Sequence, residues 1–256
     1  EEAIHQFNEY QFAKYKASSK EVKLKDVVRI VHPRPNTKEQ SELLKKIIED
    51  TLATPETWEV YISTHGSSKE TWEQIMPKMP IMATLRNLRN FCKVKANIDQ
   101  VVQKLTNEKE IRYSKQFPYR FWSAYKSLQD AMAKGEIPAE NSFDATRLME
   151  AVNTAMDISI KNLPRVPGTT FMTADNSGSM DSPVSEKSIV CRREIADLLQ
   201  AMAYRICDNA ITSVFGESFA IVPVIQQSTI LDNMQRFFNT DVGHSTNGFL
   251  AFKWLL

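Results

Sequence analysis

The spacing of hydrophobic residues divides the chain into two parts. Up to Lys161, apolar positions recur every three or four residues, and Pro, Gly or Ser separates one such segment from the next. This spacing is typical of amphipathic helices, and no alternation typical of a half-buried strand interrupts it. One segment has an apolar face formed by Ile81, Leu85, Leu88 and Phe91. The pattern predicts a series of short helices, and so an α-solenoid, although the sequence shows no fixed repeat period.

Two helix starts in this part carry a capping residue. Ser68 and Asn141 each stand directly before an apolar run with helical spacing. Ser and Asn side chains accept hydrogen bonds from the free backbone N–H groups of a first helical turn. We therefore expect both residues to act as N-caps.

The pattern changes after residues 162–168, which hold two prolines and a glycine. Strand-like and helix-like segments alternate from there on, and this alternation is typical of an α/β sheet. The strand-like segments are 169–174, 210–216 and 218–225; the helix-like segments are 186–206, 230–238 and 248–256. We predict a helical domain over residues 1–165 and an α/β domain over 166–256. With three strands, the α/β domain is expected to be represented by its first half.

The second helix-like pattern predicts which side chains face the sheet. In residues 186–206, we expect one apolar face to point inward. Its members are Ile189, Ile195, Leu198, Leu199 and Met202.

Composition narrows the class of protein. A chain of 256 residues with 42% hydrophobic and 25% charged residues has enough apolar material for one or two globular domains. It has no apolar run of the roughly 20 residues that a membrane span needs, and its acidic start is unlike a secretory signal. Cys92, Cys191 and Cys207 are far apart, which excludes a zinc ribbon and favours buried free thiols. We expect a soluble cytoplasmic protein with no membrane partner.

Basic residues concentrate in the helical part. Residues 81–126 hold ten Lys and Arg against three acids, together with seven aromatic residues. Cations neutralise phosphates and aromatic rings stack on unpaired bases, so this combination favours binding to single-stranded RNA. The alternative is that the charges form solvated helix faces and most of the rings belong to the core. Arg86 and Arg89 either grip phosphates together or pair with acids on an adjacent helix.

The loop DNSGSM, residues 175–180, holds the other candidate chemistry. It follows the first strand of the α/β domain, where ligands gather in such sheets. Asp175, Ser177 and Ser179 offer only oxygen ligands, and Gly178 lets the loop curl so that they converge. This set suits Mg²⁺ and not zinc. The alternatives are an ordinary turn and, more weakly, a nucleophilic serine, since the loop is not GxSxG.

DNSGSM resembles the metal-ion-dependent adhesion site of von Willebrand factor A domains. The resemblance implies that Asp175, Ser177 and Ser179 are ligands from the first motif and that Thr246 is the threonine of the second. A partner's carboxylate then completes the metal coordination. The third motif, an aspartate on a later strand, has no counterpart before Leu256.

The helical part is similar to the TROVE module of the Ro autoantigen family. The similarity covers nearly the whole chain, from about residue 10 to 256, and lies in stretches such as YKASSKEVKLKDVVRIVHPRP and THGSSKETWEQIMPKMPIMATLRNLRNF. It implies a ring of HEAT-like helical repeats followed by a von Willebrand factor A-like α/β domain. Ro proteins bind small Y RNAs outside this ring and take single-stranded ends of misfolded noncoding RNAs through its hole. The first ring helices have no counterpart here, so we expect a shortened or partial member, with oligomerisation as one route to a ring.

The resemblance assigns RNA contacts to individual residues. Lys14 and His32 match two of three Y RNA contact positions of the family, and the arginine position falls on Ser18 or Ser19. Together with the basic window, the expected RNA-binding residues are Lys14, Lys16, His32, Arg34, Arg86, Arg89, Lys93 and Arg112.

We therefore expect a Ro-type RNA-binding protein that holds small structured (Y-like) or misfolded noncoding RNA, as a scaffold or RNA quality-control factor. No paired carboxylates, activated nucleophile or phosphate-cradling glycine loop is present in the sequence, so we do not expect an enzyme. The alternative is a metal-dependent protein-interaction module within a larger assembly, with Mg²⁺ as cofactor and a protein carboxylate as partner.

Overall fold

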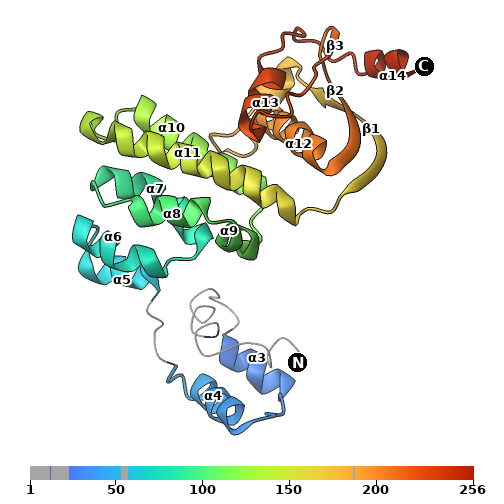
Figure 1. Ribbon diagram of the computed structural model, residues 1–256. Helices are drawn as coiled ribbons and strands as arrows, with labels where there is room; N and C mark the ends of the chain where they lie inside the picture. Colours follow the sequence, from blue (N-terminus) through green and yellow to red (C-terminus); the bar gives the residue numbers. More distant parts are fainter. Residues whose placement is uncertain (1–11, 13–22, 53–56, 187) are drawn as a thin grey trace. The chain divides into compact units, whose positions relative to one another are not determined.

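The computed structural model describes residue 12 and residues 23–52, 57–186 and 188–256. The chain forms two compact units, Glu1–Gly66 and Ser67–Leu256, called here the N-terminal and C-terminal units. Figure 1 shows the elements of each unit. The C-terminal unit contains both the basic window and the DNSGSM loop.

The N-terminal unit is helical where it is described. Its helices are α3 (Leu24–Val31), α4 (Lys38–Ile48) and α5 (Trp58–His65). Thr37 caps α4 by accepting a hydrogen bond from the Gln40 N–H at 3.2 Å. A small buried cluster packs α3 against α4, and its members are Phe12, Val28, Ile47 and Leu52.

The first half of the C-terminal unit is a succession of short helices, as the hydrophobic spacing predicts. They are α6 (Lys69–Ile75), α7 (Ile81–Lys93), α8 (Asp99–Thr106), α9 (Glu108–Ser114), α10 (Pro118–Ala133) and α11 (Ser142–Ser159), with short 3-10 turns between some of them. All four residues of the predicted apolar face of α7 are buried, from Ile81 to Phe91. The predicted spacing is confirmed here.

The two predicted caps differ. Ser68 caps α6, because its Oγ accepts a hydrogen bond from the Thr71 N–H at 3.2 Å. Asn141 precedes α11 but does not cap it with its side chain. Its side-chain amide instead donates to the Cys92 carbonyl at 2.8 Å, because both residues are buried between helices.

The second half of the C-terminal unit contains a three-stranded mixed sheet. Strands β1 (Val166–Asp175) and β2 (Cys207–Phe215) are parallel, and β3 (Phe219–Ile221) runs antiparallel to β2, in the order β1-β2-β3. Helix α12 (Arg192–Ile206) makes the crossover between the parallel strands. Two further helices follow, α13 (Ile230–Phe238) and α14 (Phe249–Leu255). The alternation of strand and helix is as expected, although β3 is shorter than predicted.

The inward face predicted for residues 186–206 is partly wrong. The helix begins only at Arg192, because Cys191 is extended and pairs with Pro183 in an isolated bridge. Ile189 therefore lies outside the helix and is 41% exposed, and Leu199 is 56% exposed. Leu198 and Met202 are buried as predicted, and the remaining buried positions include polar residues, namely Glu194, Asp197 and Gln200.

The helical and sheet-containing halves are joined inside the C-terminal unit. The Lys126 ammonium on α10 forms an ion pair with Glu194 on α12, and Asp157 on α11 accepts a hydrogen bond from the Ile230 N–H at 2.9 Å. The predicted domain boundary before Val166 coincides with the start of β1, while the compact unit spans both sides of it. The boundary between domains stays a prediction.

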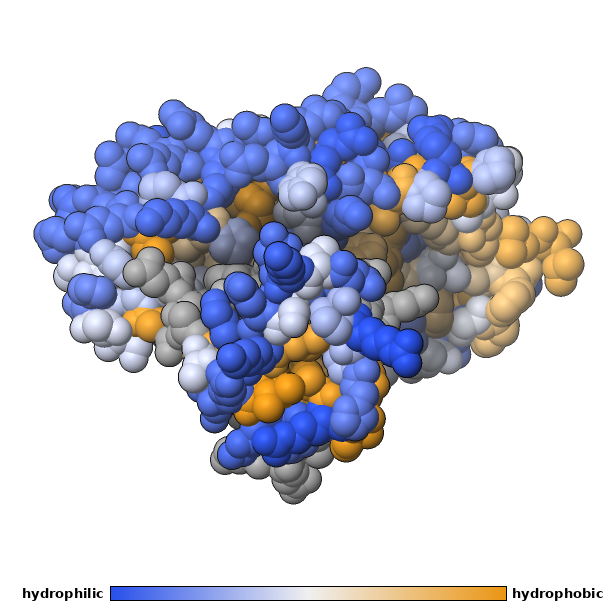
Figure 2. Space-filling view, turned by 90° about the horizontal axis from the view of Figure 1, so that it is seen from below, coloured by the Kyte–Doolittle hydropathy of each residue, from blue (hydrophilic) through white to orange (hydrophobic). Residues whose placement is uncertain are grey.

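Apolar side chains remain on the surface of α14. Trp254 stacks on Phe171 of β1, with ring centroids 5.4 Å apart, while Phe249 and Phe252 are exposed. Figure 2 shows apolar surface at its right-hand edge, where this end of the chain lies.

In the described part of the chain, none of the helices combines the length and the apolar character of a membrane span. All three cysteines are free thiols; Cys92 and Cys207 are buried and Cys191 is partly buried.

Candidate functional site

A groove between α7 and α10 lies in the middle of the basic window. Its volume is about 560 Å³, and we call it the α7–α10 groove. It is lined by Met82, Leu85, Arg86, Arg120, Ser123, Ala124 and Ser127. On α10 these positions follow helical spacing, so the groove runs along one face of that helix.

Two arginines supply the charge of the α7–α10 groove. Arg86 and Arg120 are both exposed, and no acidic side chain among the described residues forms an ion pair with either of them. Ser123 and Ser127 add hydroxyl groups to the same lining. Guanidinium groups without an acidic partner are available to bind an anion, and their planar donors match phosphate geometry. Arg86 was predicted as a site residue; Arg120 was counted in the basic window but not singled out.

A pair of exposed aromatic rings stands at the start of α10. Phe117 precedes the helix and is 56% exposed, and Tyr119 is 38% exposed. Their rings are nearly parallel, at an angle of 19°, with centroids 6.4 Å apart. The Arg120 guanidinium lies over the Tyr119 ring, 4.8 Å from its centroid. We call these two rings the Phe117–Tyr119 pair.

The other aromatic residues of the basic window divide between core and surface. Phe91, Phe121 and Trp122 are buried, as the core interpretation predicted. Tyr113, in contrast, is 87% exposed, so it does not belong to the core. Sequence spacing alone did not separate the two groups, because an aromatic residue at a helix start can face either way.

Three of the predicted RNA-binding residues in this unit have acidic partners. Arg89 and Lys93 both approach Glu136, at 3.8 and 2.8 Å, and Arg112 approaches Glu108 at 3.7 Å. The hydrogen bond from Lys93, with its positive charge, lowers the pKa of Glu136. Of the two roles considered for these arginines, pairing with an acid therefore describes Arg89, whereas Arg86 lines the groove.

The predicted residues in the N-terminal unit form a separate set. His32 and Arg34 are exposed, on either side of the buried Pro33. His32 ends α3 in a left-handed conformation, with φ at 45°, and its N–H donates to the Val28 carbonyl at 3.0 Å. Lys14 and Lys16 lie outside the described residues.

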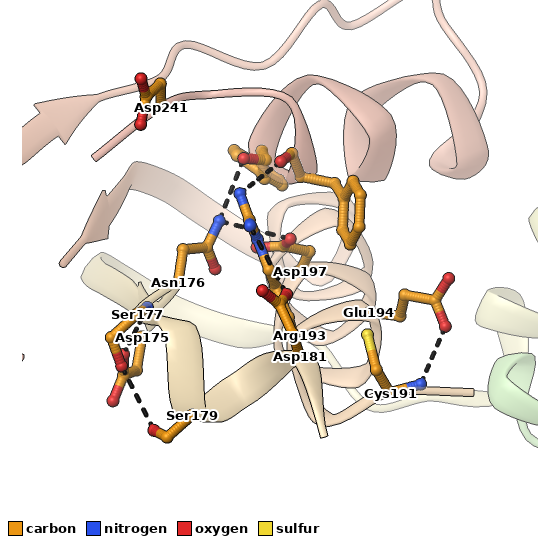
Figure 3. Close-up of polar contacts among 12 residues, drawn as sticks. Asp175, Asn176, Ser177, Ser179, Asp181, Cys191, Arg193, Glu194, Asp197 and Asp241 are labelled. Carbon is orange, nitrogen blue, oxygen red and sulfur yellow. Dashed lines mark hydrogen bonds and ion pairs between the residues drawn. The ribbon is translucent and has the colours of Figure 1, made fainter. Parts of the chain in front are cut away.

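The DNSGSM loop brings three predicted metal ligands together (Figure 3). Asp175 ends β1, and its Oδ1 accepts a hydrogen bond from the Ser177 N–H at 2.9 Å. The hydroxyl oxygens of Ser177 and Ser179 lie 3.4 Å apart. This separation is close to that of two neighbouring oxygens around Mg²⁺, about 3 Å for ligands at roughly 2.1 Å. The donor set therefore fits a hard cation.

Thr246 belongs to a loop that contacts the DNSGSM loop. The Gly178 N–H donates to the His244 carbonyl at 3.0 Å, two residues before Thr246. A Cβ on Gly178 would lie 3.3 Å from the His244 ring, so the close approach favours glycine. Thr246 itself is exposed, and no hydrogen bond among the described residues joins it to Asp175, Ser177 or Ser179.

Buried polar groups lie behind the DNSGSM loop, and sequence reasoning missed them. The Asn176 amide donates to Asp197 at 3.4 Å and to the Phe237 carbonyl at 3.1 Å. Burial raises the pKa of Asp197 to about 7, against the opposing charge of Arg193. The sequence held one signal for this buried group, because Asp197 directly precedes Leu198 on the inward face of α12.

Comparison with known proteins identifies the helical region. Residues 50–147 match the TROVE domain family. Telomerase protein component 1 of Rattus norvegicus is 36% identical over 106 residues, 40% of this chain and 4% of that protein. RNA-binding protein RO60 of Caenorhabditis elegans is 28% identical over 195 residues, 71% of this chain and 29% of that protein.

A solved structure has a similar fold. The crystal structure of the Deinococcus radiodurans RO (RSR) protein matches with a TM-score of 0.60 and 18% identity, over 96% of this chain and 57% of that one. The chain thus spans just over half of the solved chain and less than a third of these curated relatives.

The class of protein that this chain resembles follows from the helical region, which contains the segment that matches the TROVE domain. The predicted resemblance to the Ro family is confirmed, because both the sequence matches and the structural match include a Ro protein. Its fold, mostly helical with a small mixed sheet, matches a Ro protein structure.

Proposed function

We propose that this chain binds RNA, and that the α7–α10 groove is a main contact for its phosphates. The observation that carries the proposal is that one groove contains Arg86 and Arg120, neither of which forms an ion pair with an acid in the described part of the chain. Both lie within the segment that matches the TROVE domain, and one relative is named an RNA-binding protein. Cations that neutralise phosphates release counterions, so the affinity of such a contact falls as salt rises.

Removing both arginines tests this function. Arg86→Ala with Arg120→Ala should weaken binding to a structured RNA about tenfold or more at low salt. The slope of log affinity against log salt concentration should decrease by the equivalent of about two phosphate contacts. The measurement is a binding titration at several salt concentrations. The matched control removes two lysines of the same unit that have acidic partners one helical turn away, Lys69→Ala with Lys134→Ala. Equal losses in both variants, or no RNA binding by the unaltered protein, would refute the proposal.

A HEAT-like helical solenoid, followed by a von Willebrand factor A-like domain, is the arrangement in which we propose that the groove works. Small Y-like or misfolded noncoding RNA is the proposed ligand, with a scaffold or quality-control role in the cytoplasm. Identification of RNA that copurifies with the protein tests the ligand class. A role in RNA binding for Arg89, Lys93 and Arg112 is compatible with their exposed ion pairs, because such pairs are weak in water.

A second candidate function rests on the DNSGSM loop. We propose that Asp175, Ser177 and Ser179 hold Mg²⁺, with Thr246 as a further ligand, and that the ion offers an open position to a partner's carboxylate. The support is the convergence of one carboxylate and two hydroxyls on one loop. This function does not require RNA and remains possible if the groove proposal fails.

A thermal melt tests the metal proposal. Mg²⁺ should raise the melting temperature, because a ligand that binds only the folded state stabilises it, and Asp175→Ala should abolish the rise. Asp208→Ala is the control, since Asp208 lies near the start of β2, at the opposite end of the sheet, and this variant should keep the rise. An unchanged Mg²⁺ response in Asp175→Ala would remove this loop from consideration.

A further inference from the structure

We infer that the Phe117–Tyr119 pair and the α7–α10 groove form one nucleotide subsite, in which the rings stack on an unpaired base while Arg86 and Arg120 bind its phosphate. The inference rests on the proposed RNA binding and deepens it. In this subsite, the Phe117–Tyr119 pair distinguishes unpaired from paired nucleotides.

The exposure of the rings is the first step. Phe117 and Tyr119 are 56% and 38% exposed at a helix start, whereas three other rings of the same window are buried. An exposed ring gains little for the fold, because the hydrophobic contribution scales with the apolar area removed from water. A ring face that the protein does not cover can stack on a nucleobase.

The position of the cation is the second step. The Arg120 guanidinium lies 4.8 Å from the centre of the Tyr119 ring and also lines the groove that contains Arg86. A ring for the base and a cation for the phosphate are therefore close enough for one nucleotide to contact both. The guanidinium plane can itself stack on a base.

The geometry of the pair is the third step. The two rings differ in orientation by 19°, so a stack on one ring is roughly parallel to the other. In a duplex, each base is covered by its neighbours and paired at its edge, and its faces are inaccessible. Stacking on these rings therefore selects unpaired nucleotides, while the arginines accept phosphates of either kind.

An abasic probe separates the base from the phosphate. The protein should bind a short single-stranded RNA about tenfold more tightly than an abasic oligomer with the same phosphates, since about 1.4 kcal/mol of stacking is tenfold in affinity. Phe117→Ala with Tyr119→Ala should remove most of this difference and leave abasic binding unchanged. Phe143→Ala is the control, because Phe143 is a 74% exposed ring on α11 outside the groove.

A fluorescent base adds a readout that does not depend on affinity. A 2-aminopurine in the single strand should be quenched on binding to the unaltered protein and less so on binding to the double variant, with far-UV circular dichroism to verify folding. Equal affinity for the intact and abasic oligomers would overturn the subsite and leave RNA binding in place. If neither oligomer nor a duplex binds, the proposed function fails as well.

Discussion

At the scale of single residues, environment decides what each charged group does. Arg86 and Arg89 are three positions apart on α7, yet one lines a groove and the other lies 3.8 Å from Glu136. The sequence left two roles open for these arginines, a shared grip on phosphates or pairs with acids on an adjacent helix. It did not predict Glu136, which comes from a turn more than 40 positions further along the chain, and such partners depend on tertiary structure.

Asp197 gives a prediction about pH. Its pKa is raised in the folded state to about 7, so the folded protein holds this proton more tightly than the unfolded chain does. The contribution to stability is complete below the ordinary pKa of 3.8 and is lost as pH rises through about 7. Asp197→Asn removes the titration, so its melting temperature relative to the unaltered protein should rise between pH 4 and pH 8.

Asp208→Asn is the control for Asp197→Asn, and its effect on stability depends on pH in the opposite direction. Arg165 and the Gly168 N–H hold the pKa of Asp208 below its usual value, so this carboxylate contributes stability that is lost as pH falls. Asp208→Asn should therefore be the less stable protein at neutral pH and approach the unaltered protein in acid. Parallel pH profiles for Asp197→Asn and the unaltered protein would show that the buried carboxyl titrates normally.

At the scale of elements, hydrophobic period was a reliable guide and local chemistry was less so. The apolar face of α7 and the bounds of α13 follow directly from spacing. The start of α12 does not, because Ile189 fits the helical period but lies in an extended segment held by the Pro183–Cys191 bridge. Asn141 likewise has the side chain of a cap and uses it for a contact between helices. Both differences arise from contacts that local sequence does not contain.

The contact between α10 and α12 gives a prediction at this scale. Glu194 is almost fully buried, with a side chain 5% exposed, and its charge is balanced by Lys126. Lys126→Met leaves a buried carboxylate without its cation, which should lower the free energy of unfolding by about 1–3 kcal/mol. Denaturant unfolding measures the change, and adding Glu194→Gln to this variant should recover part of it.

Lys134→Met is the matched control on α10. Lys134 pairs with Asp130 on the exposed surface, so its loss should lower the free energy of unfolding much less than Lys126→Met does. Comparable losses for Lys126→Met and Lys134→Met would mean that the contact between α10 and α12 contributes no more than a surface pair.

At the scale of the whole molecule, sequence reasoning found the order of helical and mixed segments and the resemblance to the Ro family, and it placed the sites only in part. Helices followed by alternating strands and helices are confirmed in outline, because periodicity reports which faces are buried. The convergence of Asp175, Ser177 and Ser179 was also foreseeable, since the end of β1 and the curl at Gly178 fix it locally. The α7–α10 groove was not, because it needs two helices that are separated by α8 and α9 in the chain.

Proline at the start of α10 has a consequence for this groove. Pro118 stands between Phe117 and Tyr119 and occupies the first helical position, where its ring locks one backbone torsion. The backbone under both aromatic side chains is therefore already ordered before any ligand arrives. A partner that docks on them has less disorder to remove, so more of the contact energy is expressed as affinity.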